Sequence, residues 1–387
     1  MGDSDQPTWN DTIRTTAEPL PILTRVYYGS IMSAIQSLAA HGRWYKGWQE
    51  YFYPPEKGPN IVKTYDIRQN LPIRIFFPSS YDQTSPQTLP TLFSIHGGGF
   101  CLGTPAEIDG WNRHFADMHN FLVISLNYSK APWYPFPTAV TDVAALYVAA
   151  VDDESLPIDP ARIAVTGFSA GGNLALALSQ VDSVRNHPKA APSAVVPIYP
   201  CTTMTVPPSE KAKRRQYKMG SKLGGIRSQK RDWVLPIADV FDWAYLKVGT
   251  DLRDPLCSPY FAPRDHFPKH VFVVGAELDF LVCEAHQFAL KLAGKQDDPR
   301  FNSIPGRPEA GTEIGKLELE DERFAWEEDD GKGGSVRWLL VPDQVHAFDV
   351  DAGRAELGDE EGVRDAVEKT EAYVKLMGEW LLNKVWA

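Results

Sequence analysis

The sequence predicts an α/β fold for most of its 387 residues, with helices on both faces of a mainly parallel sheet. Three short apolar runs, at residues 91–95, 122–126 and 163–166, show little polar alternation, which is typical of strands buried on both faces. Helix-length stretches such as 139–150 and 173–184 separate and follow them. This alternation of strand and helix is the pattern of a doubly wound sheet.

The N-terminal part of the chain precedes this pattern. Residues 22–53 carry aromatic and aliphatic side chains at spacings near three and four, which predicts helical pieces interrupted around Gly42 and Gly47. Two strand-like runs, at 61–67 and 73–78, are expected to pair as a hairpin.

The second half of the chain continues the sheet and contains two inserted segments. Further strands are expected at 195–199, 270–274 and 336–341. Residues 363–381 form one apolar stripe at helical spacing, which predicts a terminal helix packed on the sheet. The insertion at 201–248 contains a basic run, 211–231, which we interpret as a mobile, solvated flap. Alternatively, this basic run attracts an acidic substrate, a phosphate or an anionic membrane surface. The acidic stretch 297–334 is expected to be a solvated surface excursion.

Composition excludes several classes of protein. A formal net charge of −11 argues against a nucleic-acid-binding protein, which usually presents a basic face. The first residues lack the pattern of a signal peptide, and no apolar run approaches the roughly 20 residues that span a bilayer. We therefore expect a cytoplasmic protein without stable membrane insertion, and a homodimer is left open. The four cysteines have no metal-type spacing and are expected to be reduced: Cys101, Cys201, Cys257 and Cys283.

The pentapeptide GFSAG at residues 167–171 carries the strongest chemical signal and fits the pattern G-x-S-x-G. It lies directly after the strand at 163–166 and before a helix that we expect to begin at Asn173. A sharp strand-to-helix turn leaves no room for side chains at the flanking glycines and exposes the serine oxygen. The helix that follows directs its N-terminal N–H groups toward developing negative charge. Ser169 is therefore the candidate nucleophile.

A glycine-rich loop, HGGGF at residues 96–100, follows the buried strand at 91–95. Consecutive glycines let backbone N–H groups turn toward a substrate oxygen. Such donors stabilise the tetrahedral intermediate of acyl transfer, and the loss of one costs on the order of a hundredfold in rate. A phosphate-binding loop would end in Gly-Lys-Ser/Thr, which is absent here. His96 is expected to brace the loop rather than to act in catalysis.

Together these motifs resemble the hormone-sensitive-lipase family (family IV) of α/β-hydrolase carboxylesterases. Further segments match in chain order, namely 127–132 with 135–137, the Asp-Pro-x-x-Ser-Pro segment at 254–259, the acid loop at 275–281 and the base loop at 346–348. The resemblance runs from about residue 60 to the C-terminus, the insertions excepted. It implies an N-terminal cap segment over residues 1–59, a catalytic α/β-hydrolase domain over 60–387, and a cap element within 201–248.

The resemblance also implies the roles of the site residues. Ser169, His346 and Asp279 would form the catalytic triad, in the chain order Ser, Asp, His that this fold uses. Glu277 is a nearby competitor for the acid, but Asp279 has the position that the family uses. The oxyanion hole would be formed by the backbone N–H groups of Gly98, Gly99 and Ala170.

Two positions depart from the family pattern. Trp133 stands where an acidic residue usually follows the Ala-Pro pair, and Cys283 stands where a second acid usually follows the catalytic Asp. Neither change touches the triad, and Cys283 is expected to be a buried, inert thiol. The aromatic N-terminal helices are expected to line a roomy, apolar pocket.

The function expected from these features is a serine carboxylic-ester hydrolase that acts through an acyl-enzyme. Its substrates would be small to medium or bulky apolar esters or lactones, and no cofactor or metal is expected. Alternatives on the same scaffold are an acyltransferase or a catalyst of elimination or cyclisation. A non-catalytic receptor, such as the plant gibberellin receptors that resemble this family without its catalytic histidine, is disfavoured because His346 is present.

Overall fold

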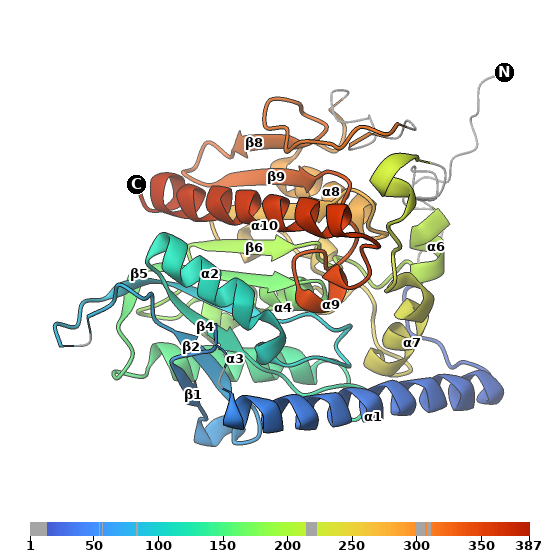
Figure 1. The fold of residues 1–387 in the computed structure, drawn as a ribbon, viewed down its shortest axis with the longest axis horizontal. Helices are drawn as coiled ribbons and strands as arrows, with labels where there is room; N and C mark the ends of the chain where they lie inside the picture. The colour runs from blue at the N-terminus through green and yellow to red at the C-terminus, as the bar shows by residue number, and fades with distance from the viewer. Residues whose placement is uncertain are drawn as a thin grey trace.

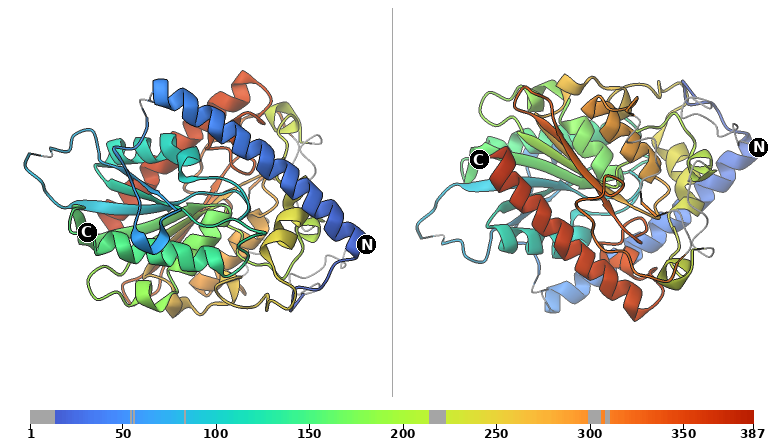
Figure 2. Two further views of the ribbon diagram at one scale, coloured as in Figure 1. Left: turned by 90° about the horizontal axis from the view of Figure 1, so that it is seen from below. Right: turned by 90° about the horizontal axis from the view of Figure 1, so that it is seen from above.

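The computed structural model describes residues 14–53, 55, 57–82, 84–213, 223–298, 306–307 and 311–387. Within these residues the strands form one sheet in the order β1-β2-β4-β3-β5-β6-β7-β9-β8, with helices on both of its faces (Figures 1 and 2). The predicted α/β architecture is confirmed. The strands are β1 (Ile61–Lys63), β2 (Ile73–Phe76), β3 (Leu89–Ile95), β4 (Leu122–Leu126), β5 (Ile158–Phe168), β6 (Ala194–Ile198), β7 (His270–Ala276), β8 (Ala325–Asp329) and β9 (Ser335–Val341).

The centre of the sheet is parallel. Strands β4, β3, β5, β6, β7 and β9 all run in one direction, while the hairpin β1–β2 and the edge strand β8 pair antiparallel. Every side chain of β3, β4, β6 and β7 is buried, as their apolar sequences predict. Because parallel strands end at the same edge of a sheet, the loops after β3, β5, β7 and β9 meet there.

Two layers of helices cover the sheet. Helices α3, α4 and α8 pack into one apolar core, and α2 and α10 into another on the opposite face. The predicted terminal helix is α10, and a π turn, η8 (Leu381–Val385), continues it. The helices are α1 (Ile22–Phe52), α2 (Asp109–His119), α3 (Thr138–Val151), α4 (Ala170–Leu178), α5 (Asp182–Arg185), α6 (Pro208–Lys213), α7 (Leu235–Tyr245), α8 (Val282–Ala293), α9 (Asp351–Arg354) and α10 (Glu360–Trp380), with 3₁₀ turns η1 (Asp66–Arg68), η2 (Pro105–Ile108), η4 (Gly225–Ser228), η5 (Pro259–Phe261) and η6 (Arg264–His266).

Two helix predictions were wrong in detail. The N-terminal helical pieces are one continuous helix, α1, which runs straight past Gly42 and Gly47. A glycine costs a helix interior only about 1 kcal/mol, and this helix of 31 residues accommodates three of them, Gly29 included. The helix after the GFSAG motif begins at Ala170 rather than Asn173 and ends at Leu178.

The acidic stretch 297–334 is not only a surface excursion. Its residues Ala325–Asp329 form β8, which pairs with β9 at the edge of the sheet. Trp326 is buried against the core, whereas Glu327 and Asp329 are exposed. Acidic side chains on an exposed edge strand discourage pairing with another chain, which explains acidic residues inside a strand. Of the helices that the structure describes, none has both the length and the apolar character needed to cross a bilayer.

Candidate active site

Ser169 occupies a tight turn between β5 and α4. Its backbone has φ 57° and ψ −117°, an unusual conformation for a residue with a side chain, and its N–H donates to the carbonyl of Ile198 (2.9 Å). The flanking glycines are sterically required. A Cβ on Gly167 would lie 2.1 Å from the carbonyl oxygen of Gly171, and one on Gly171 would lie 2.1 Å from that of Ile95. The turn therefore places the serine side chain at the edge where the parallel strands end.

The structure brings Ser169, His346 and Asp279 together. His346 Nε2 lies 2.7 Å from Ser169 Oγ, and His346 Nδ1 lies 2.7 Å from Asp279 Oδ2. Asp279 follows β7 and His346 follows β9, so two neighbouring strands supply them. The carboxylate accepts only from a protonated Nδ1, which leaves Nε2 free to accept the serine hydroxyl proton. The backbone N–H of Leu281 donates to Asp279 Oδ1 (2.9 Å) and fixes the carboxylate.

The surroundings of His346 favour its protonated form. Burial alone would lower the pKa of His346, but the neighbouring Asp279 carboxylate outweighs burial, with smaller contributions from Asp232 and Asp349, and the pKa is raised. This arrangement suits a general base that must stabilise the positive charge it acquires. Glu277, the competitor for the acid, instead accepts the backbone N–H of Asp343 (2.7 Å).

A buried network beside His346 was missed by the sequence analysis. The ring of Tyr199 lies 4.9 Å from the imidazole, and its hydroxyl donates to Asp349, which also accepts from Tyr373. Burial raises the pKa of the Asp349 carboxyl, against the effect of the two tyrosine hydrogen bonds. The one signal in the sequence was the position of Asp349 three residues after His346, which does not identify its partners.

The glycine loop lies against the serine turn. Gly98 (φ 112°) and Gly99 (φ 58°) both have positive φ, and the carbonyl of Gly98 accepts the N–H groups of Cys101 (3.0 Å) and Leu102 (2.9 Å). A Cβ on Gly97 would lie 3.4 Å from the Cβ of Ser169. The loop therefore passes the nucleophile closely, with its backbone in a conformation that glycine alone adopts readily.

His96 is placed to support this loop. Its ring stacks on Tyr128 at 4.4 Å between centroids, and its Nδ1–H donates to the carbonyl of Gly97 (2.7 Å). The side chain is buried, and burial holds its pKa well below the usual range. A neutral, stacked imidazole fits a bracing role.

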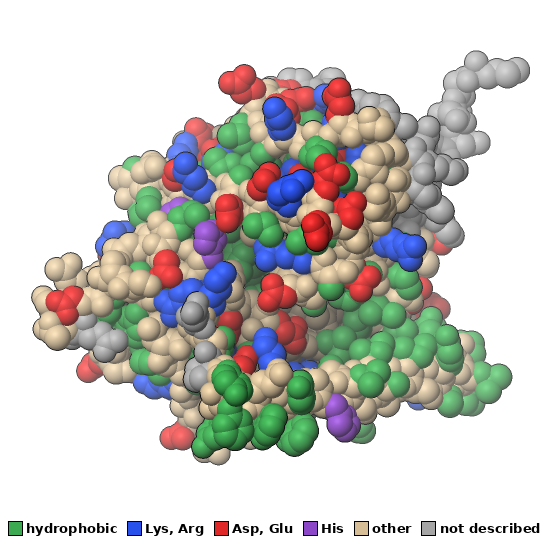
Figure 3. Space-filling model, in the orientation of Figure 1, with side chains coloured by type: hydrophobic (Ala, Val, Ile, Leu, Met, Phe, Trp, Pro, Cys, Tyr) green, Lys and Arg blue, Asp and Glu red, His purple; other side chains and the backbone are tan. Residues whose placement is uncertain are grey.

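Cavities open on two sides of Ser169. The larger, about 390 Å³, is lined by apolar groups that include Leu102, Ile108 and Trp233. The smaller is about 50 Å³, and Phe241 lies between the two and lines both. The larger cavity adjoins a polar hollow of about 920 Å³, which residues of α2, α9 and α10 line. The surface is also visibly hollowed between α1 and the body of the molecule (Figure 3).

The aromatic residues of the N-terminal segment do not line these cavities as expected. Among the described residues, α1 contributes only Ala39 and Lys46 to the larger cavity. Trp44 and Trp48 face solvent, with 73% and 57% of their surface exposed. Trp133, one of the departures from the family pattern, is exposed, and Cys283 is half-buried rather than buried.

The basic run also differs from expectation, because the cations that the structure places there are largely buried in ion pairs. Lys211 lies 2.7 Å from Glu284, Arg227 lies 2.9 Å from Asp343, and Lys230 lies 3.1 Å from Asp365. The interpretation as a solvated flap is wrong for these three residues. The part of the run at 214–222 lies outside the described residues. Over the described ranges, the structure has no group of three or more His, Cys, Asp or Glu side chains arranged to hold a metal ion.

Known proteins resemble this chain in sequence and fold. A family profile described as the alpha/beta hydrolase fold matches residues 92–309. Arylacetamide deacetylase of Oryctolagus cuniculus is 38% identical over 133 residues, 33% of this chain and 32% of that protein. An arylesterase of Saccharolobus solfataricus is 33% identical over 223 residues, 57% of this chain and 66% of that protein. The chain thus matches about a third of the length of the mammalian relative.

Solved structures extend the likeness to nearly the whole chain. A hyperthermophilic esterase of Pyrobaculum calidifontis superposes with a TM-score of 0.60, covering 95% of this chain and 100% of that one at 20% identity. The carboxylesterase EstE1, cloned from a metagenomic library, superposes with a TM-score of 0.58 at 24% identity and covers 89% and 97% of the two chains. At these identities the likeness shows a shared fold.

Proposed function

Because the chain belongs to the α/β-hydrolase fold family, we propose that it is a serine carboxylic-ester hydrolase. The observation that carries this proposal is the hydrogen-bonded series Asp279–His346–Ser169, with 2.7 Å at each step, at the junction of two cavities. Nucleophile, base and orienting acid at these distances have the geometry of covalent acyl transfer. The names of the relatives, which include arylesterase and carboxylesterase, agree with it.

In the proposed reaction, Ser169 Oγ attacks the acyl carbonyl carbon while its proton passes to His346 Nε2. The carbonyl oxygen becomes an oxyanion that receives hydrogen bonds from the backbone N–H groups of Gly98, Gly99 and Ala170. Collapse of this intermediate breaks the bond to the alcohol oxygen, which takes the proton from His346 and leaves. Water then attacks the acyl-enzyme with His346 as base again, and the acid product and free Ser169 result.

The two cavities suggest the shape of the substrate. A space of about 50 Å³ holds only a few heavy atoms, whereas about 390 Å³ holds an aromatic or branched apolar group. We therefore propose esters of a short acyl group with a bulky apolar alcohol or phenol. Relatives named arylacetamide deacetylase and acetyl-hydrolase fit a substrate with one small and one large part.

The test is hydrolysis of p-nitrophenyl esters from acetate to decanoate by the wild type and by Ser169→Ala. The proposal expects activity that is highest for the shortest chains and is abolished by the substitution. Equal rates for the two proteins would refute the serine mechanism. If the wild type hydrolyses nothing and binds an ester analogue equally well with and without the Ser169 hydroxyl, the chain acts as a receptor.

A further inference from the structure

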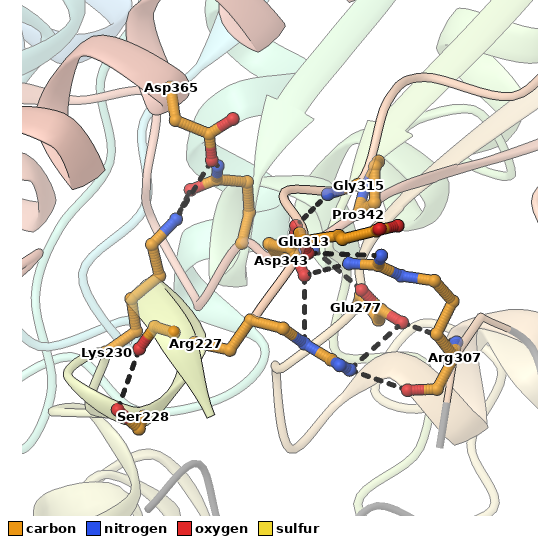
Figure 4. Close-up of polar contacts among 12 residues, drawn as sticks. Arg227, Ser228, Lys230, Glu277, Arg307, Glu313, Gly315, Pro342, Asp343 and Asp365 are labelled. Atoms are coloured by element: carbon orange, nitrogen blue, oxygen red, sulfur yellow. Dashed lines mark hydrogen bonds and ion pairs between the residues drawn. The ribbon is translucent and has the colours of Figure 1, made fainter. Parts of the chain in front are cut away.

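A buried network of charged side chains joins the segment inserted after β6 to the loops that carry Asp279 and His346 (Figure 4). Its acids are Glu277 and Asp343, both fully buried, and Asp365, which is 7% exposed. Its four cations come from three parts of the chain: Arg227 and Lys230 from the inserted segment, Arg307 from the stretch before β8, and Lys369 from α10. Buried charges of this kind are costly unless they are paired, so their arrangement is informative.

Two of these acids stand at the start of the two catalytic loops. Glu277 follows β7 directly and precedes Asp279 by two residues, and Asp343 follows β9 and precedes His346 by three. Glu277 Oε2 accepts the backbone N–H of Asp343 at 2.7 Å. The side chain of one loop therefore holds the backbone of the other, within a few residues of the Asp279–His346 hydrogen bond.

Arg227 contacts both acids with its guanidinium, whereas Arg307 reaches Asp343 with its side chain and Glu277 only through its backbone N–H. Arg227 Nε lies 2.9 Å from Asp343 Oδ1 and its Nη2 lies 3.7 Å from Glu277 Oε1, while Nη2 also donates to the carbonyl of Arg307 (2.6 Å). The side chain is 2% exposed and comes from η4, on the inserted segment. A planar guanidinium can bind two carboxylates at once through different nitrogens, which a lysine ammonium does less well.

The contacts of Arg227 hold together two groups that otherwise repel. Glu277 and Asp343 are both fully buried, where repulsion between carboxylates is weakly screened. Burial raises the pKa of Glu277, the Asp343 carboxylate raises it further, and Arg227 acts in the opposite direction. A guanidinium placed between them converts this repulsion into attraction on both sides. Arg227 lines neither cavity at Ser169, so its effect on the reaction must pass through the two loops.

We propose that Arg227 is a positioning residue of the active site, which binds Glu277 and Asp343 together and so fixes the Asp279 loop against the His346 loop. The inference rests on the proposed serine-hydrolase function. Loss of Arg227 shifts the acid relative to the base without touching the substrate cavities. It therefore lowers kcat and leaves KM nearly unchanged.

The experiment compares Arg227→Met with the wild type at temperatures where both are folded. We expect kcat for p-nitrophenyl acetate to fall by about tenfold to hundredfold, as misplacement of a catalytic group by about 1 Å does, with KM changed by less than about twofold. The far-downfield ¹H resonance of the His346 Nδ1–H proton should weaken or disappear. Arg227→Lys, which keeps the charge without the fork, should recover part of both signals.

The matched control is Arg68→Met. Arg68 Nε lies 2.6 Å from the buried carboxylate of Asp142, so this substitution also removes a guanidinium from a buried acid. The pair joins η1 to α3 and neither residue lines a cavity at Ser169, while Arg68 is more exposed (30%) than Arg227 (2%). Arg68→Met should lower stability and leave kcat and the proton resonance as in the wild type. If Arg68→Met and Arg227→Met reduce kcat equally, the effect is general destabilisation and the proposal is overturned.

A charge-balanced variant separates positioning from mere charge compensation, and it serves also if Arg227→Met does not fold. Arg227→Met combined with Glu277→Gln removes one cation and one anion, and leaves Asp343 paired with Arg307. The proposal expects stability to recover while kcat stays low; recovery of both overturns it. If the wild type hydrolyses no ester, the proposed function fails. The far-downfield resonance of the His346 Nδ1–H proton still tests the role of Arg227 in that case, because a resonance that is unchanged in Arg227→Met overturns the positioning role.

Discussion

The second and third glycines of the loop, Gly98 and Gly99, are each too close to a neighbouring group to accept a Cβ, but the neighbouring groups differ. A methyl group on Gly98 would lie 2.3 Å from the carbonyl oxygen of Leu102, a backbone atom of the same turn. A methyl group on Gly99 would lie 2.4 Å from the ring of Phe241, a side chain that can be removed. The φ of Gly98 is 112°, and that of Gly99 is 58°, which alanine tolerates at a cost of about 1–2 kcal/mol.

These contacts set the size of the effects. The clash at Gly98 must displace the backbone whose N–H groups are proposed to bind the oxyanion, and loss of one such donor costs about 2.7–4 kcal/mol, or 10²–10³ in kcat. We expect Gly98→Ala to lose activity on this scale. Gly99→Ala alone should lower kcat by about as much as Gly98→Ala. When Phe241→Ala removes the neighbouring ring, kcat of the Gly99→Ala protein should rise again by at least about tenfold. The backbone strain that remains should mainly lower the stability of the fold.

The assay is kcat and KM for p-nitrophenyl acetate, with each glycine variant made in the wild type and in Phe241→Ala. The Phe241→Ala protein is the reference for the double variants, because Phe241 also lines both cavities. Thermal unfolding followed by circular dichroism confirms that each protein is folded. Wild-type kcat in Gly98→Ala would refute the reasoning, as would equal rescue of both glycine variants by Phe241→Ala.

Three further predictions concern buried charges. Asp279→Asn should lower kcat, measured by steady-state kinetics, about 10⁴-fold, while circular dichroism shows that the fold is retained. A loss of less than about tenfold would mean that another residue is the orienting acid. Asp279 raises the pKa of His346 against the effect of burial, so kcat/KM of the wild type should decline as pH falls through a value above 6.5. In Asp279→Asn only the smaller contributions of Asp232 and Asp349 oppose burial, and the decline should move to lower pH. A decline centred below pH 6.5 in the wild type would contradict this prediction. Lys211→Met leaves the Glu284 carboxylate buried without its cation. This change should lower the free energy of unfolding, measured by urea titration, by about 3–5 kcal/mol. An unchanged urea midpoint of unfolding would mean that Glu284 is protonated or solvated.

The parts of the site that the sequence predicts are those with local signals. A glycine pattern at a strand end fixes the backbone within a few residues, so the turn at Ser169 and the loop at Gly98 follow from short segments alone. Asp279 and His346 each follow an apolar strand, and parallel strands deliver their ends to one edge. The structure places these side chains within hydrogen-bond distance of one another, as the order of motifs suggested.

The buried ion pairs had no such signal. The basic run that contains Arg227 and Lys230 has the composition of a solvated segment. Composition gives the number of charges, but it does not show which acidic residue each cation pairs with in the fold. The partners, Asp343 and Asp365, lie more than a hundred residues further along the chain and reach the cations only through the fold. Whether a charged residue is solvated or buried depends on such long-range pairs, and local pattern does not determine it.

Helix α1 shows the same limit for apolar residues. The spacing of its aromatic and aliphatic side chains correctly predicts a helix, because periodicity reports the geometry of the backbone. The same spacing predicts an apolar face, which is expected to line the pocket. In the structure another face, which includes Met32 and Ala39, packs against the protein, while Trp44 and Trp48 are exposed to solvent. Periodicity shows that a helix has two different faces, and only the packing of the other elements decides which of them is covered.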